Sequence, residues 1–368
     1  MPLEELRGMP EGRILVIHQG ALGDLIVALP AIKALRDALQ PAWLEMMGHP
    51  WTLALIHGHP YADAIIDINR GDMAPFFQEA APLPAGMSAH LGGFDAAFCF
   101  SQSTTLAHNL RRSGIKRTFI FPPFPDQRIH VIDHHFQSLK ALGISPPPTL
   151  PQIVLRNEER VEARRFFLQR GWDLNAIIAL HPGAGGRKKV WPPYRFAALG
   201  RALTRESKKL LICQGPADEE VTSEVLKGLA GIPYLLVHDK HITSLTALLS
   251  CVSLFIGNDS GISHLAAALE VPTITIFGPT DPLCWAPRGD RAFWLQGKAA
   301  CAPCARDQQR LCKRQQCLEG IEVEAVMAFI AEKKMTHHTA ACHQGRPLDR
   351  ETLPHERQGE EGMSLPPP

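Results

Sequence analysis

The sequence lacks long apolar runs and any clear excess of charge. Residues 177–180 and 273–277 are apolar but far shorter than the roughly 20 residues that cross a bilayer. Lysine and arginine total 38, aspartate and glutamate 37, so a net charge of +1 offers no general attraction for nucleic acid or anionic membranes. The first residues are acidic rather than signal-like. We expect a cytoplasmic monomer that binds no nucleic acid and contacts a membrane only peripherally.

Regularly spaced cysteines are also scarce. There are nine, an odd number, which argues against a secreted disulfide framework. Only Cys301, Cys304, Cys312 and Cys317 cluster, as C-x2-C-x7-C-x4-C. Four thiolates at this spacing are compatible with a tetrahedral zinc site. Free thiols or a labile disulfide are the alternative that we favour, and we expect no required metal or other cofactor.

Three nucleotide-site motifs are missing. No G-x-G-x-x-G follows the first apolar strand, which argues against a nucleotide-dependent oxidoreductase. No Walker loop is present, because no Gly-Lys is followed by Ser or Thr. No Asp-x-Asp pair is available to chelate a divalent ion on a nucleotide diphosphate. Positive charge for such a ligand must therefore come from side chains and helix-start amides.

What the sequence does contain is a repeated alternation of strand, loop and helix. The first half opens with a buried strand at 13–18, a small-residue turn at 19–23 and a helical pattern at 24–39 that Pro30 must kink or restart. Further strands are expected at 64–68 and 96–100. In the second half strands are predicted at 177–181, 210–214, 234–238, 254–256 and 273–277, and helices at 194–205, 219–229, 244–249, 263–269 and 323–333.

This alternation predicts an α/β protein with two Rossmann-like domains, whose parallel sheets face a central cleft. A proline-rich segment at 145–151 and a charged amphipathic stretch after it mark the boundary. We expect an N-terminal Rossmann-like domain at 1–155 and a C-terminal Rossmann-like domain at 156–335. The His-, Pro- and Glu-rich residues 336–368 are predicted to be a disordered tail.

Two glycine-containing strand exits in the second half are suited to phosphate. In Gly257-Asn258-Asp259-Ser260-Gly261, a strand ends just before a helix whose first amides lack partners, and His264 follows one turn later. Helix capping by Asp259 or Ser260 explains this segment equally well. In residues 181–192, Lys189 follows three glycines and is able to reach a phosphate oxygen. A solvated basic turn is the alternative there.

Two further strand exits carry carboxylates. Asp218, Glu219 and Glu220 stand at a helix start, where capping or a bond from ribose hydroxyls explains them. In the first half, Gly23-Asp24 follows the first strand. Asp24 is a candidate general base for an acceptor hydroxyl, although a capping role is at least as plausible from the sequence.

Taken in order, these segments resemble the lipopolysaccharide heptosyltransferase family, glycosyltransferase family 9, from about residue 13 to 332. The matching residues are Gly23-Asp24 with Pro30, Lys189 before Trp191-Pro192, Glu219, Asp259-Ser260-Gly261 with His264, and Gly278-Pro279-Thr280. The resemblance implies a GT-B fold, ADP-heptose as donor and a lipopolysaccharide inner-core acceptor at the inner membrane face. It also implies that the domain at 1–155 binds the acceptor and that the domain at 156–335 binds the nucleotide-sugar donor. It implies donor phosphates at Lys189 and the Asp259 segment, ribose at Glu219, and inversion with Asp24 as base.

A compact cationic run lies at 110–117. A solvated face is its simplest interpretation. Because the resembled family uses an anionic glycolipid acceptor, Arg111 and Arg112 are candidate acceptor or membrane contacts. Two alternatives to the heptose transferase remain open: a non-catalytic sugar-nucleotide-binding protein of the same fold, and a family member that uses another nucleotide sugar.

Overall fold

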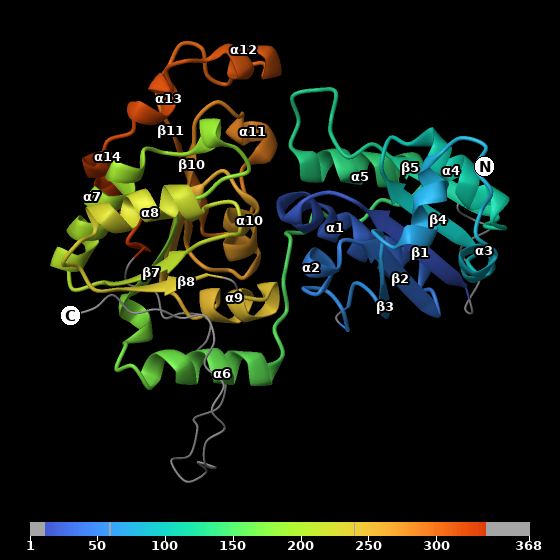
Figure 1. The fold of residues 1–368 in the computed structure, drawn as a ribbon, viewed down its shortest axis with the longest axis horizontal. Helices are drawn as coiled ribbons and strands as arrows, with labels where there is room; N and C mark the ends of the chain where they lie inside the picture. The colour runs from blue at the N-terminus through green and yellow to red at the C-terminus, as the bar shows by residue number, and fades with distance from the viewer. Residues whose placement is uncertain (1–11, 59, 239, 336–368) are drawn as a thin grey trace, which may run out of the picture. The chain divides into compact units, whose positions relative to one another are not determined.

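The computed structural model describes residues 12–335, apart from residues 59 and 239 (Figure 1). The predicted disordered tail from residue 336 onward lies outside the described residues. The contacts divide the chain between Ile153 and Val154 into two compact units, each with its own sheet and core. None of the helices in the described part combines the length and hydropathy that a membrane span requires.

The first unit contains a parallel sheet that, within the described residues, has five strands in the order β3-β2-β1-β4-β5. Its strands are β1 Arg13–His18, β2 Trp43–Gly48, β3 Ala64–Asp67, β4 Ala96–Phe100 and β5 Arg117–Phe121. The sequence pattern does not predict β2, because Glu45 interrupts its apolar run. In the structure Glu45 is buried, and it lies 3.0 Å from His90 Nε2 and accepts a bond from the Trp43 indole. The sequence pattern also does not predict β5, which begins inside the cationic run at 110–117.

Helices and one 3₁₀ segment connect these strands. They are α1 Leu22–Leu39, α2 Pro50–Leu53, η2 Gly71–Phe77, α3 Ala85–Gly92, α4 Thr104–Arg112 and α5 Val131–Ala141. The first helix continues through Pro30 instead of restarting there, so the missing N–H of Pro30 is tolerated within a buried helix face. Leu15, Ile17 and Phe94 are among the core residues that anchor the sheet.

The second unit contains a parallel sheet of six strands in the described residues, in the order β11-β10-β9-β6-β7-β8. They are β6 Ile177–His181, β7 Lys209–Cys213, β8 Tyr234–Val237, β9 Leu254–Asn258, β10 Thr273–Phe277 and β11 Ala292–Gln296. The sequence does not predict the edge strand β11, because it is only half-buried, with Trp294 41% exposed, and so shows no continuous core pattern.

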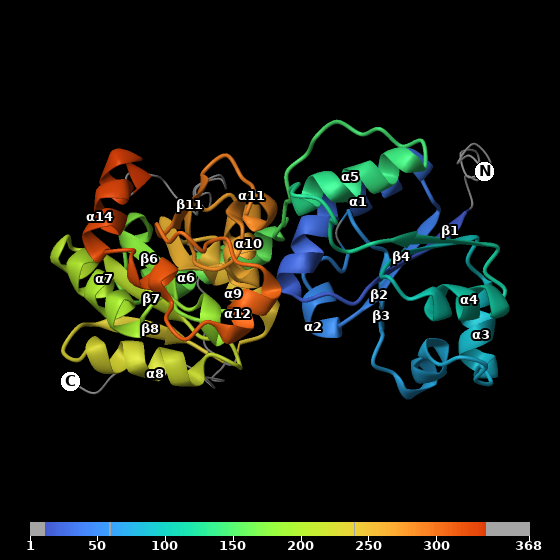
Figure 2. The same cartoon turned by 90° about the horizontal axis from the view of Figure 1, so that it is seen from above.

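Helices cover this sheet in two groups (Figures 1 and 2). The first, α7 Pro193–Arg205, α8 Glu219–Gly228 and α14 Val323–Glu332, packs together, and so does the second, α6 Asn157–Leu168, α9 Ile242–Leu249 and α10 Gly261–Ala268. Short helices α11 Pro282–Trp285, α12 Arg306–Leu311 and α13 Gln316–Glu319, with 3₁₀ turns η3 Leu174–Ala176 and η4 Arg187–Lys189, complete the unit.

Both units therefore have Rossmann topology. In each, the chain order reverses direction beside one strand pair: β1 and β4 in the first unit, β6 and β9 in the second. Ligands of such sheets bind outside the carboxyl ends of the strands at this switch point. The fold thus directs attention to the residues that follow β1 and β4, and to those that follow β6 and β9.

Candidate functional site

In the second unit the switch point is organised by Asn258, the last residue of β9. Its side chain is fully buried; Oδ1 accepts the Trp191 N–H at 2.9 Å, and Nδ2 donates to the Pro182 carbonyl at 2.7 Å. One amide thus fixes both ends of the 182–191 loop against β9. A buried amide with its donors and acceptor engaged is a rigid support. The sequence pattern gives Asn258 no separate role, because its partners are distant in the chain.

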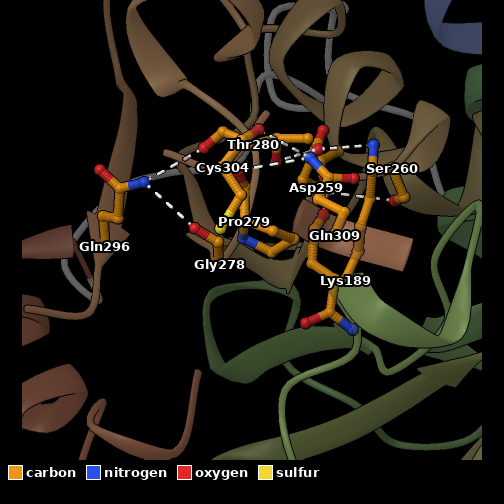
Figure 3. Close-up of polar contacts among 11 residues, drawn as sticks. Lys189, Asp259, Ser260, Gly278, Pro279, Thr280, Gln296, Cys304 and Gln309 are labelled. Atoms are coloured by element: carbon orange, nitrogen blue, oxygen red, sulfur yellow. Dashed lines mark hydrogen bonds and ion pairs between the residues drawn. The ribbon is translucent and has the colours of Figure 1, made fainter. Parts of the chain in front are cut away.

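The loop that Asn258 fixes carries Lys189 to the end of β9. Lys189 Nζ donates to Asp259 Oδ2 at 2.8 Å, and Thr280 Oγ1 donates to the same oxygen at 2.7 Å (Figure 3). The Asp259 side chain is 8% exposed and that of Lys189 is 32% exposed. The predicted segments at Lys189, Asp259 and Gly278-Pro279-Thr280 therefore meet at one place.

The capping alternative does not describe the Asp259 segment. Ser260 is the N-cap residue of α10, yet it makes no side-chain cap bond, and the bonds of Asp259 go to Lys189 and Thr280. The segment uses its polar side chains for contacts with other loops. This leaves the first amides of α10 as the anion-attracting element at the helix start.

The Gly278-Pro279-Thr280 turn is held from two sides (Figure 3). Gln296 Nε2 donates to the carbonyls of Gly278 at 3.2 Å and Thr280 at 3.1 Å. From the cysteine-bearing segment, the Cys304 N–H donates to the Pro279 carbonyl at 2.7 Å, and Gln309 Nε2 lies 3.4 Å from the same oxygen. Sequence reasoning does not find either glutamine, since no local pattern marks a side chain that supports a distant turn.

His181, at the end of β6, connects two more loops. Its Nε2 lies 3.1 Å from Asp218 Oδ2, and its Nδ1 lies 3.2 Å from Ser260 Oγ. Burial opposes ionisation of Asp218, but bonds from His181 and from the Gly215 and Ala184 amides outweigh it and lower the pKa of that carboxyl. The backbone of Gly183 approaches Asp218 so closely that a Cβ on Gly183 would lie 2.0 Å from the Asp218 carboxyl carbon.

The other predicted donor residues lie around this edge. Glu219, the first residue of α8, is exposed, and nothing in its surroundings tests a ribose contact. Its neighbour Glu220 forms an ion pair with Arg187 of the glycine loop. Gly261 begins α10, and His264 is buried within the first turn of that helix. Asp218, rather than Glu219, is the carboxylate that the loops enclose.

In the first unit, Asp24 lies near the start of α1, after β1. Its Oδ2 accepts the Ala21 N–H at 3.0 Å, so the capping role considered from the sequence is present. The turn is tight, because a Cβ on Gly20 would lie 2.6 Å from Asp24 Cβ and 2.8 Å from His18 Cε1. Asp24 is only partly buried. Capping with one oxygen does not prevent a carboxylate from accepting a proton, so the base role stays a prediction.

Two buried histidines lie near this turn. Burial lowers the pKa of His18 to about 4, against an opposing backbone hydrogen bond with Asp24 and with help from nearby His49. Burial also lowers the pKa of His135 to about 3, helped by His134 and His18. At neutral pH both rings are therefore uncharged, and the first switch point differs in charge from the second.

The cationic pair does not lie beside Asp24. Arg111 and Arg112 end α4, just before β5 begins, which places them at the amino edge of the sheet. Arg111 donates to the Thr118 carbonyl at 3.4 Å, and Arg112 to the Ala81 carbonyl at 3.1 Å. Cations at a helix C-terminus are also favoured by the helix dipole. Contact with the acceptor stays a prediction, and this location does not favour it.

The zinc alternative gains no support. Among the described residues, no group of three or more His, Cys, Asp or Glu side chains is arranged to hold a metal ion. Cys304 Sγ donates to the Cys301 carbonyl and Cys312 Sγ to the Arg314 carbonyl, while Cys301 is exposed and Cys317 buried. Burial, and then the neighbouring thiols, raise the pKa of Cys304 and Cys317. Close spacing in sequence therefore does not assemble four ligands here.

Comparison with solved structures identifies the fold. The glycosyltransferase family 9 protein from Veillonella parvula has a TM-score of 0.74 at 20% identity, over 88% of this chain and 97% of that one. The E. coli heptosyltransferase WaaC with ADP-2-deoxy-2-fluoro heptose has a TM-score of 0.60 at 20% identity, over 87% and 99%. At 20% identity these likenesses show the fold alone, which is the GT-B fold of two Rossmann-like units.

Sequence comparison identifies the family. A family model described as glycosyltransferase family 9 (heptosyltransferase) matches residues 123–314. The lipooligosaccharide heptosyltransferase 2 of Haemophilus influenzae is 31% identical over 303 residues, which cover 76% of this chain and 87% of that protein. The chain belongs to glycosyltransferase family 9. The predicted family is confirmed, and so are the fold class and the expectation of an enzyme.

Proposed function

We propose that this protein transfers heptose from ADP-heptose to an inner-core sugar of lipopolysaccharide. Family membership supports the reaction class, and its relative from Haemophilus influenzae is a lipooligosaccharide heptosyltransferase. The WaaC structure of the same fold is described with an ADP-heptose analogue, which supports the choice of donor. The observation on this chain that carries the proposal is the Lys189, Asp259 and Thr280 contact at the β6–β9 switch point.

In this proposal the second unit binds the donor. The pyrophosphate lies at the first amides of α10, where Ser260, Gly261 and His264 begin the helix, and Lys189 neutralises part of its charge. Asp259, whose Oδ2 accepts both Lys189 and Thr280, offers its carboxylate to hydroxyls of the transferred sugar. Glu219 accepts bonds from the ribose. These interactions stabilise ADP as it leaves, and no metal or other cofactor is needed for that step.

In the same proposal the first unit binds the acceptor and supplies the general base. Asp24 takes the proton of the acceptor hydroxyl while that oxygen attacks the anomeric carbon, the bond from that carbon to the ADP oxygen breaks, and the configuration inverts. The mechanism requires Asp24 to come within about 3 Å of the acceptor hydroxyl in the working complex. The domain assignments at 1–155 and 156–335, and action at the cytoplasmic face of the inner membrane, belong to the same proposal.

Transfer assays with ADP-heptose against UDP- and GDP-sugars test the reaction and the donor together. We expect product with heptose-deficient lipopolysaccharide and ADP-heptose, with inverted anomeric configuration by NMR. Turnover with another nucleotide sugar alone would contradict the donor assignment. Tight nucleotide-sugar binding without any turnover would instead favour the non-catalytic alternative.

A further inference from the structure

Ser260, His181 and Asp218 form a continuous polar chain at the proposed donor site. They come from three separate places, the start of α10, the end of β6 and the residue before α8. Ser260 Oγ lies 3.2 Å from His181 Nδ1, and His181 Nε2 lies 3.1 Å from Asp218 Oδ2. The His181 side chain is 4% exposed and that of Asp218 11%. The chain therefore leads from a buried carboxylate to the helix start that faces the ligand.

The carboxylate end of this chain fixes the direction of its hydrogen bonds. Bonds from the Gly215 and Ala184 amides and from His181 keep Asp218 ionised, and an ionised carboxylate only accepts. His181 Nε2 must therefore carry a hydrogen. In the neutral ring Nδ1 is then an acceptor, so the Ser260 hydroxyl donates to it. In the charged ring Nδ1–H donates to Ser260 Oγ, and the Ser260 hydrogen turns elsewhere.

Little within the protein receives that hydrogen. Ser263 Oγ lies 3.4 Å from Ser260 Oγ, at the long limit of a hydrogen bond, and itself donates to the Asn258 carbonyl at 2.6 Å. Ser263 is fully buried, whereas Ser260 is only partly buried. An anion at the start of α10 is thus the stronger acceptor for the Ser260 hydroxyl. Charging His181 makes that hydroxyl a donor to the anion.

The charged groups around His181 favour protonation of its ring when an anion binds. Lys189 and Asp259 pair with each other and largely cancel, while Asp218 is a further buried negative charge. His264 is buried in the first turn of α10, one turn beyond Ser260. A pyrophosphate would otherwise meet a net negative set of Lys189, Asp259 and Asp218. A proton on His181 neutralises that set.

We propose that His181 and Asp218 are positioning residues, and that binding of the donor pyrophosphate takes up one proton on His181 and turns the Ser260 hydroxyl toward a phosphate oxygen. This rests on the donor site of the proposed function. The step is a protonation: solvent or buffer gives up a proton, which forms the Nδ1–H bond of His181. Nδ1–H then donates to Ser260 Oγ, and the Ser260 hydroxyl, which previously donated to Nδ1, donates to a phosphate oxygen. By linkage, a ligand that binds with uptake of one proton binds more weakly as pH rises, by up to about tenfold per pH unit.

Calorimetric titration with ADP-ribose, in buffers of different ionisation enthalpy, measures this proton directly. ADP-ribose is the better probe because its pyrophosphate is a diester, whereas the terminal phosphate of ADP ionises near pH 6, as phosphomonoesters do. We expect proton uptake approaching one per molecule bound and a Kd that rises with pH. His181→Asn should still bind, with a Kd about tenfold higher at low pH, no proton uptake and a flat pH profile.

Matched variants separate positioning from general structure. Ser260→Thr keeps the hydroxyl and should retain uptake, while Ser260→Ala should lose most of it. His90→Asn, in the first unit, removes a histidine that contacts Glu45 and should leave uptake unchanged. If circular dichroism shows that His181→Asn is unfolded, Asp218→Asn carries the test, because it removes the negative charge that favours a proton on His181 and should reduce the uptake.

The outcomes distinguish this inference from the proposed function. ADP-ribose binding by the wild type without proton uptake would overturn the role of His181 and leave the donor site standing. Uptake that persists in folded His181→Asn would assign the proton to another group and overturn it equally. Failure of ADP-ribose, ADP and ADP-heptose all to bind would instead contradict the donor site itself.

Discussion

The two units place opposite chemistry at the same topological position. The switch point of the second unit presents Lys189 beside a helix start, together with the Ser260 and His181 pair. The switch point of the first presents the carboxylate of Asp24 and the neutral ring of His18. Topology therefore fixes where a ligand meets each unit, and a few loop residues decide whether that edge attracts phosphate or accepts a proton. Four changes test this contrast.

The largest expected effect follows Asp24→Asn. The amide keeps an oxygen for the Ala21 N–H but cannot take a proton at neutral pH, so kcat should fall about 10³-fold, within the range for loss of a general base. Donor Kd should stay within about twofold. Asp37→Asn, on the same helix, is the control and should keep full activity, because Asp37 is exposed and its ion pair is with Lys33, four residues earlier. Near-normal turnover of the Asp24→Asn variant with donor bound would remove the base role.

Lys189→Met should weaken donor binding next most strongly. Loss of a charge-assisted contact to phosphate is worth about 2 kcal/mol, or roughly a 30-fold rise in the Kd for ADP. The neighbouring Lys188 is a natural control, because its Nζ donates to the Arg310 carbonyl at 2.6 Å and the Cys312 carbonyl at 3.0 Å. Lys188→Met should lower the Tm and change Kd less than threefold. An equal loss of affinity in the two variants would show that the positive charge of this loop, and not the position of Lys189, determines donor affinity.

The sequence predicts the strands and the charged residues in this contrast, but not the side chains that hold the loops in place. Buried strands such as β1, β6 and β10 were predicted with their observed ends, because fully buried strands give continuous apolar runs. Lys189 and Asp24 are predicted as site residues because each follows a strand beside small residues and their order along the chain matches the resembled family. Each segment alone leaves capping or a solvated turn open. The contacts between His181 and Asp218, 37 residues apart, have no local signature. Side-chain pairing across loops depends on tertiary packing, which a single sequence does not encode locally.

Acid should destabilise the first unit through its neutral histidines. In the unfolded chain a histidine titrates near 6.5, whereas in the fold the pKa of His18 is about 4 and that of His135 about 3. The unfolded state therefore binds more protons below pH 6.5. The stability that the neutral rings contribute is complete above that value and is lost as pH falls toward 4 and 3, at up to about 1.4 kcal/mol per pH unit for each ring.

His135→Leu isolates one of these rings. Its Nδ1 is buried without a hydrogen-bond partner among the described residues, so an apolar replacement leaves no new unsatisfied group. Urea unfolding between pH 6 and 4.5, followed by circular dichroism, should show an unfolding free energy that depends less on pH than in the wild type, by up to about 1.4 kcal/mol per pH unit. His108→Asn, on the exposed side of α4, should keep the full slope. An unchanged slope in His135→Leu would mean that this ring is already charged in the fold.

The smallest effect is expected from changing Gln296, whose side chain supports the turn that contains Thr280. Gln296→Leu removes two bonds, to Gly278 at 3.2 Å and Thr280 at 3.1 Å, while Cys304 still holds Pro279 at 2.7 Å. At about 1 kcal/mol net, the donor KM should rise about fivefold with kcat nearly unchanged, because the turn acts on Asp259 and not on Asp24. The longer bonds of Gln309 predict a smaller rise for Gln309→Leu. A fall in kcat at unchanged KM would instead show that this turn affects proton transfer at Asp24. That result would contradict the assignment of donor binding to the second unit and proton transfer to the first.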